Sequence, residues 1–518
     1  MKFYKVGGCV RDQMLGQTPR DVDYVVTNTT ANTLLKGGFK LVLVGGKFPI
    51  FLHPTTGDEV VLAGYDYANS KDYFADKQSL YDDLSRRDLT INAMAVDQFS
   101  GDCIDPFGGQ KDLHNRILKH TGDSFRDDPI RVLRVARLAA RYEKLGFTIH
   151  PDTLSLMNEI SCAGELDELD PERVYKELSR AMLEQSPSVF FKVLNESGCL
   201  APVFPEIEAL KGQSQPKQHH PEGDVFIHQM MVLEQARLLS DSVDVMIASL
   251  CHDFGKGLTP MEKLPHHHGH EKAGVPLVES FCDRLKMPRK VKQLAMISSE
   301  YHTHIHRAKE ITAKSFLKLL NRFGAFGQSH DRFDKFLLVC EADARGRLGF
   351  ENRSYDQSDI AKKVLQESRR AVWCKEKLMT MMPRDRSTYI YRERLSRIEK
   401  ELGKIHNSDN YKKYREKYER FFKLNPREQL EVLILDRAHL HSNYVKQTLA
   451  ILLIPQKQKN KILEYVNELQ KIESSFDPSA YNSIGDSRSA KYNLFLSSIA
   501  GVNQPLNRLS FEPQGKSL

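Results

Sequence analysis

Short apolar runs separated by turn residues dominate the first 107 residues of the chain. The runs lie within residues 40–46, 48–52, 59–63 and 92–96 and consist mainly of Val, Leu, Ile, Phe, Ala and Met. Runs of this length between Gly, Pro and Asp residues are typical of strands. We therefore predict a small mixed α/β domain at the N-terminus.

The pattern changes after Asp112. Apolar positions then recur at helical spacing, so all regular structure beyond this residue is expected to be helical. Helices are predicted over 129–142, with Pro129 in the first turn, and over 171–183, 188–197 and 225–239. The segment 212–224 is rich in Gln, Pro, Lys and His and is expected to be a linker. A long charged helix or helical pair is expected over 389–423, and 477–518 is expected to be loosely ordered. The fold class is thus α+β, a small mixed-sheet head followed by an all-α body.

Length and composition narrow the class of protein further. A chain of 518 residues should hold several domains. It has no signal-like apolar start and no apolar stretch of the ~20 residues that a membrane span needs, so we expect no membrane contact and a cytoplasmic location. The eight cysteines lack Cys-x-x-Cys spacing, which disfavours disulfides and zinc-thiolate sites.

The net charge of +7 is unevenly distributed. Residues 351–518 hold 31 basic and 21 acidic side chains, whereas the rest of the chain holds 44 and 47. The excess suggests a polyanionic partner for the C-terminal third, although a solvated helix face of mixed charge would show the same bias.

Asp21 and Asp23 lie two positions apart in a run that ends in β-branched residues, so on a strand both carboxylates would leave one face. Mg²⁺ in phosphate-handling sites takes few protein ligands and adds water and phosphate oxygens. The preceding Gly7-Gly8 turn can admit a triphosphate to the backbone N–H groups, and Arg11 can neutralise it. Each feature alone is an ordinary turn or surface group, but together they predict metal-assisted phosphoryl transfer.

A second cluster, Arg86-Arg87-Asp88, places two guanidinium groups beside a carboxylate. One arginine can hold a phosphate while Asp88 fixes another group in orientation. A surface ion pair is an equally good explanation of this cluster alone.

A third cluster lies in the helix predicted over 129–142. Arg131, Arg134 and Arg137 recur every three residues and gather along one side of that helix. Asp128 and Arg131 together offer an acceptor and a donor that can pair with a base edge. For a single helix, a solvated charged face would be the simpler interpretation.

These clusters occur in the order and spacing of a known family. With Asp105-Pro106-Phe107-Gly108-Gly109, they resemble the class II tRNA nucleotidyltransferases, the CCA-adding enzymes of the DNA polymerase beta superfamily. The resemblance implies that Asp21 and Asp23 are catalytic and bind Mg²⁺, and that tRNA, CTP and ATP are the partners. It also implies nucleotide contacts for the remaining cluster residues: Gly8, Arg11, Arg87, Asp88, Asp128, Arg131, Arg134 and Arg137. The segment 169–177 resembles the family's helix that braces this site.

One stretch departs from the family pattern. Residues 67–79 stand where the family carries a flexible loop used in the change from C to A addition, but here the stretch is short and lacks glycine. Two alternatives within the class therefore stay open, an enzyme that adds only CC and a poly(A) polymerase, which shares these motifs.

The middle of the chain is rich in histidine. His228, His252-Asp253 and Asp343 are the elements of an HD phosphohydrolase, and nitrogen and oxygen ligands of this kind suit a divalent ion such as Ni²⁺, Mn²⁺ or Mg²⁺. The surrounding residues resemble the HD domain behind the gamma-proteobacterial nucleotidyltransferases, which implies phosphodiesterase, nucleotidase and phosphatase activity. His302-Thr303 stands where His-Asp is expected, so His304 or His306 is considered as a substitute.

The expected organisation is a nucleotidyltransferase head over 1–140, a helical neck for nucleotide and tRNA binding over 141–212, an HD domain over 225–350 and a basic helical extension over 351–518 that could bind tRNA. We expect a monomer or a homodimer. A rival from another class keeps only the HD phosphohydrolase and uses the head as a tRNA-binding module.

Overall fold

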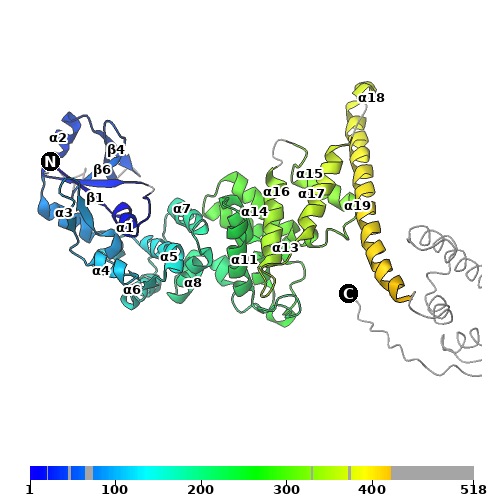
Figure 1. The fold of residues 1–518 in the computed structure, drawn as a ribbon, viewed down its shortest axis with the longest axis horizontal. Coiled ribbons are helices and arrows are strands. Elements are labelled where there is room, and N and C mark those ends of the chain that lie inside the picture. The colour runs from blue at the N-terminus through cyan, green and yellow to red at the C-terminus, as the bar shows by residue number, and fades with distance from the viewer. Residues whose placement is uncertain (20, 45–47, 65–73, 328–330, 372–374, 422–518) are drawn as a thin grey trace, which may run out of the picture. The chain divides into compact units, whose positions relative to one another are not determined.

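The N-terminal head is built on a mixed sheet of seven strands in the order β4-β5-β6-β2-β1-β8-β9 (Figure 1). β2 runs parallel to β6, and the other neighbouring strands are antiparallel. The strands of this sheet are β1 (Lys2–Val6), β2 (Asp23–Thr27), β4 (Lys40–Val44), β5 (Phe48–Leu52), β6 (Glu59–Leu62), β8 (Ala95–Asp97) and β9 (Cys103–Ile104). The predicted mixed-sheet head is therefore confirmed.

The computed structural model describes residues 1–421 apart from 20, 45–47, 65–73, 328–330 and 372–374. Residues 1–403 form one unit, and a second unit begins at Lys404. Most of the stretch 67–79, and the segment 477–518, lie outside the described residues.

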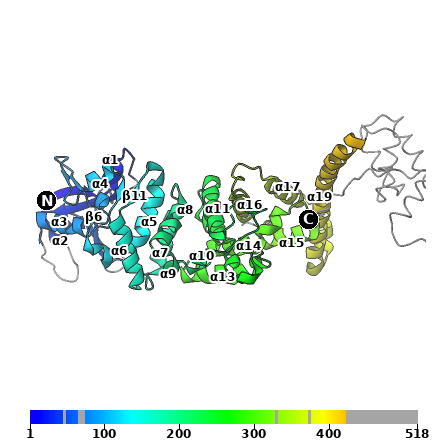
Figure 2. The same ribbon diagram turned by 90° about the horizontal axis from the view of Figure 1, so that it is seen from below.

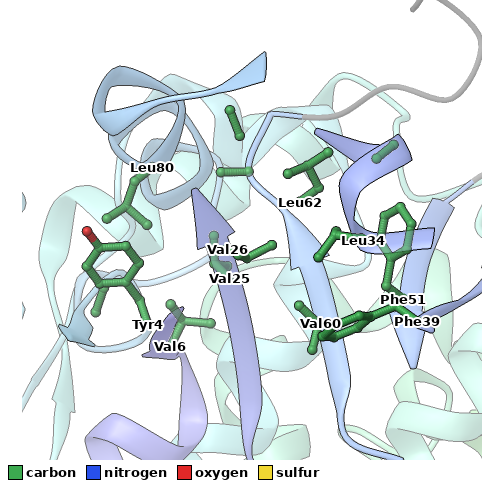
Figure 3. Close-up of a cluster of buried hydrophobic side chains, with 14 of the residues drawn as sticks. Tyr4, Val6, Val25, Val26, Leu34, Phe39, Phe51, Val60, Leu62 and Leu80 are labelled. Carbon is green, nitrogen blue, oxygen red and sulfur yellow. The ribbon is translucent and has the colours of Figure 1, made fainter. Parts of the chain in front are cut away.

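The core of the head lies between the sheet and two short helices (Figure 3). Val26 and Leu62 of the central strands pack with Leu34 of α2 (Ala31–Lys36) and Leu80 of α3 (Lys77–Ser85). These apolar side chains are at most 1% exposed, so their removal from water stabilises the sheet that carries the acidic residues.

The Gly7-Gly8 segment does more than turn the chain. Gly7 adopts φ +73°, a left-handed conformation that favours glycine, and Gly8 starts the helix α1 (Gly8–Met14). The predicted strand-turn-strand is therefore a strand-helix-strand. In the antiparallel register of β1 and β2, Asp23 pairs with Val6, which brings the acidic strand end beside this turn.

Two small sheets accompany the large one. β3 (Thr29–Thr30) pairs with β7 (Phe74–Ala75), and β10 (Ile117–Leu118) pairs in parallel with β11 (Thr148–Ile149). β10 and β11 follow Asp112, so the expectation of helix alone beyond that residue was wrong at these positions. Two-residue strands give too short a pattern for sequence periodicity to detect.

The rest of the described chain is helical. The longer helices in the first part are α4 (Gly109–His114), α5 (Arg131–Tyr142), α6 (Pro151–Cys162), α7 (Pro171–Met182) and α8 (Pro187–Glu196), followed by the short α9 (Leu200–Val203) and α10 (Pro205–Glu208). Further along are α11 (Val225–Leu239), α12 (Val243–Cys251), α13 (His270–Arg284), α14 (Arg289–His306), α15 (Ala313–Arg322), α16 (Asp331–Arg345), α17 (Asp356–Arg369), α18 (Lys375–Thr380) and α19 (Pro383–Phe421). Single 3₁₀ turns lie at Thr90–Asn92, Asp123–Asp127, Glu143–Leu145, Phe254–Leu258 and Met261–Lys263.

The predicted helices are present as α5, α7, α8 and α11, with α5 beginning two residues after the predicted position. Polar residues cap several of them. Asp170 accepts the backbone N–H of Arg173 with Pro171 at the first helical position, and Asp224 caps α11 in the same way. Of the charged region predicted over 389–423, the described part, 389–421, lies in the single helix α19.

Five helices surround the histidine-rich centre. α11, α13, α14 and α16 lie together in Figures 1 and 2, and α12 packs against α11, α14 and α16. Over the part of the chain that the structure describes, no helix is both long enough and apolar enough to cross a membrane.

Candidate functional site

The head contains a cavity of about 450 Å³ at the end of β2 and along α5. Its volume lies in the range of small-molecule sites. Eight arginines and four aspartates line it, which gives it a net positive character suited to a polyanion. All ten residues predicted for the head site line it: Gly8, Arg11, Asp21, Asp23, Arg87, Asp88, Asp128, Arg131, Arg134 and Arg137.

Asp21 and Asp23 both face this cavity, although only Asp23 belongs to β2. Partial burial raises the pKa of Asp23, the positive charge of Arg87 opposes this rise, and the negative charge of Asp21 adds to it. Within the described residues, neither carboxylate has an ion-pair partner. Two unpaired carboxylates in an arginine-lined cavity are a donor set that fits a divalent cation.

The Gly7-Gly8 turn forms one wall. A Cβ on Gly7 would lie 2.7 Å from Nη1 of Arg87, so the missing side chain leaves room for that guanidinium group. Arg11 is 5% exposed and donates from Nε and Nη2 to Oδ1 of Asp12, at 2.9 and 2.8 Å. Arg11 therefore lines the cavity while it is held by the neighbouring carboxylate.

Asp88 is buried beneath the cavity and has several hydrogen-bond donors. Its Oδ1 accepts from the N–H of Leu89 and from Asn92, and its Oδ2 accepts from Nε of Arg134 at 2.7 Å. Burial opposes ionisation, but Arg134 and the hydrogen bonds outweigh it and hold the pKa of Asp88 well below its usual range. The carboxylate expected to hold another group in orientation thus holds the guanidinium of Arg134.

Asp128 and Arg131 both face the cavity, but each also has protein partners. Arg173 of α7 donates from Nη1 and Nη2 to the two oxygens of Asp128, at 3.0 and 2.7 Å. Arg131 donates to the backbone carbonyls of Ser124 and Arg86. Both side chains are therefore fixed in position before any ligand arrives.

Two further arginines of α5, Arg137 and Arg141, line the cavity and pair with carboxylates of neighbouring segments. Arg137 donates from Nε to Glu177 at 2.7 Å and is also near Glu184, which makes α7 the brace expected from the resemblance. Arg141 reaches Oδ2 of Asp12 at 3.1 Å. Sequence reasoning did not single out Arg141 or Arg180, which both line the cavity. Arg141 continues the helical spacing from Arg137 and was detectable, whereas Arg180 comes from a separate helix.

A second cluster of titratable side chains lies among the five packed helices. The residues predicted for a metal site converge here: His228 from α11, His252-Asp253 at the end of α12 and Asp343 from α16. Nε2 of His228 lies 3.2 Å from Oδ1 of Asp343, and Nε2 of His252 lies 3.2 Å from Oδ2 of Asp253. These four side chains are at most 5% exposed.

Two further histidines extend this cluster. Nε2 of His270 and Nε2 of His302 lie 3.3 and 3.5 Å from Oδ1 of Asp253. His304 instead makes an edge-to-face contact with Tyr301, and Thr303 donates to Glu271. Neither His270 nor His302 was among the predicted ligands, although His302 was noted in the sequence as part of the His302-Thr303 pair. Only the packing of α13 against α14 reveals that they meet.

The ring orientations favour metal binding. The Nδ1 atoms of His228, His252 and His270 lie within hydrogen-bond distance of backbone carbonyls, at 2.7 to 2.9 Å. If Nδ1 carries the proton that these carbonyls accept, the lone pair of each Nε2 faces the cluster. Nε2 of His228 and of His252 is buried without a hydrogen-bond partner in the described chain, as expected for ligand atoms.

Asp253 is central to this arrangement. Burial disfavours its charged form, but His252 and Lys256 outweigh burial and keep its pKa well below its usual range. Nζ of Lys256 lies 2.7 Å from Oδ2 of Asp253 and donates to Gln215. The donor set of buried imidazoles and carboxylates fits a divalent ion of the first transition series.

The segment 212–224, predicted as a linker, contributes to this cluster. Its Gln215 binds Lys256, and Oε1 of its Glu222 lies 3.1 Å from Nδ1 of His228. Asp224 accepts from the N–H of Gly212 as well as capping α11, which closes the segment into a loop. The composition of this segment indicated the absence of regular structure but gave no sign of these contacts.

Fold and sites together define a polymerase-type nucleotidyltransferase head with a separate histidine-aspartate cluster. Residues 3–119 match the model of the poly A polymerase head domain, 146–211 match the probable RNA and SrmB-binding site of polymerase A, and 225–323 match the HD domain. The proteins named multifunctional CCA protein of Hahella chejuensis and Haemophilus influenzae are 48% and 47% identical over 372 and 377 residues. The alignments cover 71% and 70% of this chain and 87% and 90% of those proteins. The chain belongs to the multifunctional CCA protein family.

Solved structures share the fold. A CCA-adding enzyme in complex with ATP superimposes with a TM-score of 0.52 at 18% identity and covers 77% of this chain and 88% of its own. The Thermotoga maritima CCA-adding enzyme complexed with tRNA gives a TM-score of 0.50 at 17% identity, covering 79% of this chain and 91% of its own. At these identities the likeness concerns the fold.

Proposed function

We propose that this chain adds CCA to the 3′ end of tRNA from CTP and ATP, without a nucleic-acid template, and that its HD domain hydrolyses phosphate esters at damaged 3′ ends. Family membership supports both activities. The observation that carries the first is the pair Asp21 and Asp23. Within the described residues their carboxylates have no ion-pair partner, and they lie in a cavity that eight of the described arginines line.

The head residues divide the work of nucleotidyl transfer. Divalent ions held by Asp21 and Asp23, with Mg²⁺ as the proposed metal, would supply charge that activates the attacking 3′-hydroxyl and stabilises the leaving pyrophosphate. The N–H of Gly8 and the guanidinium groups of Arg11 and Arg87 hold the triphosphate. The new bond joins the tRNA 3′-oxygen to the α-phosphorus, and the bond to pyrophosphate breaks.

Nucleotide choice would lie with Asp128 and Arg131. Each oxygen of a carboxylate can accept more than one hydrogen bond, so Asp128 can bind a base amino group while Arg173 still holds it. Guanidinium N–H groups of Arg131 that do not serve the two carbonyls can donate to the base edge. C and A each carry an amino group that U lacks, and a site built for that group leaves its acceptor unpaired against U.

The HD cluster would hydrolyse a 2′,3′-cyclic phosphate or a terminal phosphate. His228, His252, Asp253 and Asp343 are the proposed ligands, and a divalent metal such as Ni²⁺ would supply a nucleophile at neutral pH. Their burial excludes bulk water, and the carbonyls at the Nδ1 atoms fix each imidazole ring.

One assay tests the transferase and separates its alternatives. The protein is incubated with tRNA lacking its CCA end and with CTP, ATP or both, and the products are sized. We expect CC with CTP alone and CCA with both nucleotides. Products that stop at CC with both nucleotides identify a CC-adding enzyme, and long A tails with ATP alone identify a poly(A) polymerase.

The organisation proposed for the chain is a head over 1–140, a neck over 141–212, an HD domain over 225–350 and a basic extension over 351–518. The bases for tRNA binding are the neck's match to an RNA-binding model and the positive charge of the extension. A tRNA substrate implies a cytoplasmic location.

A further inference from the structure

A second cavity, of about 390 Å³, lies beside the HD cluster and has no role in the function described so far. It is formed by the end of α14, the end of α16, the turn that follows α16 and the start of α17. Much of its wall, residues 344–357, lies beyond the 225–323 segment that matches the HD model. Its volume suits a nucleotide-sized ligand.

The charge of this cavity is strongly positive. Among the described residues, Lys309, Arg345, Arg347 and Arg353 line it together with one carboxylate, Asp356. Arg345 is partly neutralised, because its Nη2 lies 2.7 Å from Glu341. Arg353 stacks over the ring of Phe350, and within the described residues no carboxylate pairs with it. Such a surplus of cations in a concave site favours an anion.

The cavity shares side chains with the HD cluster. Nε2 of His306, in the cavity wall, lies 2.6 Å from Oδ2 of Asp343, and the hydroxyl of Tyr355 lies 2.9 Å from Nδ1 of the same histidine. Nη2 of Arg347 lies 3.6 Å from Oδ1 of Asp343, and its Nε is buried without a hydrogen-bond partner in the described chain. A ligand in the cavity would therefore lie next to a proposed metal ligand.

We propose that this cavity is a phosphate-binding subsite for a ribonucleotide at the RNA 3′ end, with Arg347 and Arg353 as its principal anion contacts. Arginine suits this role because its planar fork can bind two phosphate oxygens at once. The ring of Phe350, with the guanidinium of Arg353 above it, offers a flat surface on which a base can lie. This proposal rests on the proposed hydrolase function of the HD domain. The subsite would bind the RNA substrate of that activity.

Hydrogen-deuterium exchange of the full chain locates the ligand. Adenosine 2′-monophosphate is the probe, adenosine is the uncharged comparison, and EDTA is present so that no metal contributes. We expect slower exchange in peptides covering 344–357 with the nucleotide and no change with adenosine. Unchanged exchange in these peptides at saturating nucleotide, or equal protection by adenosine, overturns the proposal.

Two arginine variants test the contact itself. Arg353→Gln should weaken nucleotide binding measured by protection of 344–357 about tenfold, because one charge-assisted contact is lost. Arg370→Gln, at the opposite end of α17 and paired with Glu367, should leave it unchanged. Equal weakening by both variants, or by neither, contradicts the proposal. The thermal midpoint of each variant shows whether it is folded.

The subsite and the hydrolase can fail separately. His252→Ala removes a proposed metal ligand and should abolish hydrolysis of a 2′,3′-cyclic phosphate, while nucleotide protection of 344–357 persists. If the wild-type protein hydrolyses the substrate but shows no protection, the subsite is wrong and the HD function stands. If protection is present but no hydrolysis occurs with any divalent metal, the hydrolase function is wrong.

Discussion

Arg134 donates from Nε to Oδ2 of Asp88 over 2.7 Å, and this bond joins two segments of the head that are 46 residues apart in sequence. Arg134 belongs to α5, and Asp88 follows α3. Because both line the head cavity, the contact fixes an arginine of that cavity by means of a carboxylate that is itself buried.

Asp88→Asn should destabilise the head and flatten its response to acid. The folded-state pKa of Asp88 is depressed, so its stabilisation is present above the unfolded value of about 3.9 and is lost as pH falls below it. Because the side chain of Arg134 is 40% exposed, solvent screens the ion pair. We expect Asp88→Asn to lower the free energy of unfolding by about 1–2 kcal/mol at neutral pH. Thermal unfolding between pH 2 and 7 measures this. Asp241→Asn, at a pair whose carboxylate is 91% exposed, should change little. Parallel pH profiles for Asp88→Asn and wild type would contradict the assignment.

Asp21→Asn and Asp23→Asn should each lower CMP and AMP incorporation at least a thousandfold, because the proposed metal site loses a charged ligand. Hydrolysis of a cyclic phosphate should persist in both variants. His252→Ala should show the opposite pattern. If incorporation survives both aspartate substitutions, the head is a binding module and the HD domain carries the whole activity.

Arg137→Met should lower the thermal midpoint of the protein strongly. The substitution leaves Glu177 with only the half-exposed Arg180, whose Nη1 lies 3.8 Å away, and takes away the arginine beside Glu184. Breaking a buried pair in this way costs about 3–5 kcal/mol. The double variant Arg137→Met with Glu177→Leu should recover part of the loss, because one of the unpaired charges is also gone. A double variant whose loss equals the sum of the two single losses would exclude the coupling.

His302→Ala should weaken divalent-metal binding to the HD cluster, because Nε2 of His302 lies 3.5 Å from Oδ1 of Asp253. His304→Ala, two residues away on the same helix, is the matched control and should bind metal like wild type, since His304 makes an edge-to-face contact with Tyr301 instead. Calorimetric titration with Ni²⁺ and Mn²⁺ compares the two. The reverse order of affinities would identify His304 as the ligand that replaces the missing aspartate at Thr303.

The sequence predicted the head cavity well because its residues are clustered in local motifs. Asp21 and Asp23 are two apart, and the arginines of α5 recur every three residues, so local geometry already places them together. The contacts between distant segments could not be predicted in this way. Arg173 is 45 residues from Asp128, and nothing in its local pattern indicates that it holds that carboxylate. Gly7 was expected in a turn. That its positive φ leads directly into the helix α1 could be seen only from the backbone of the structure.

The same limit applies to the HD cluster. The His252-Asp253 pair has a recognisable signature, and His228 and Asp343 could be matched to it by resemblance. His270 and His302 became candidates only because α13 and α14 pack side by side. Tertiary packing, and not spacing along the chain, brings the two histidines within reach of one ion together with Asp253.

Because of the contacts of the loop over 212–224, the neck and the HD domain cannot be separated at Val225 without loss of contacts to the HD cluster. A fragment beginning at Val225, where the HD model begins, would lose Glu222 behind His228 and Gln215 behind Lys256. Recombination or truncation at that junction would thus yield a helical bundle with a loosened metal pocket. A fragment or chimera designed to keep the proposed hydrolase activity of this chain would therefore have to include the thirteen residues 212–224.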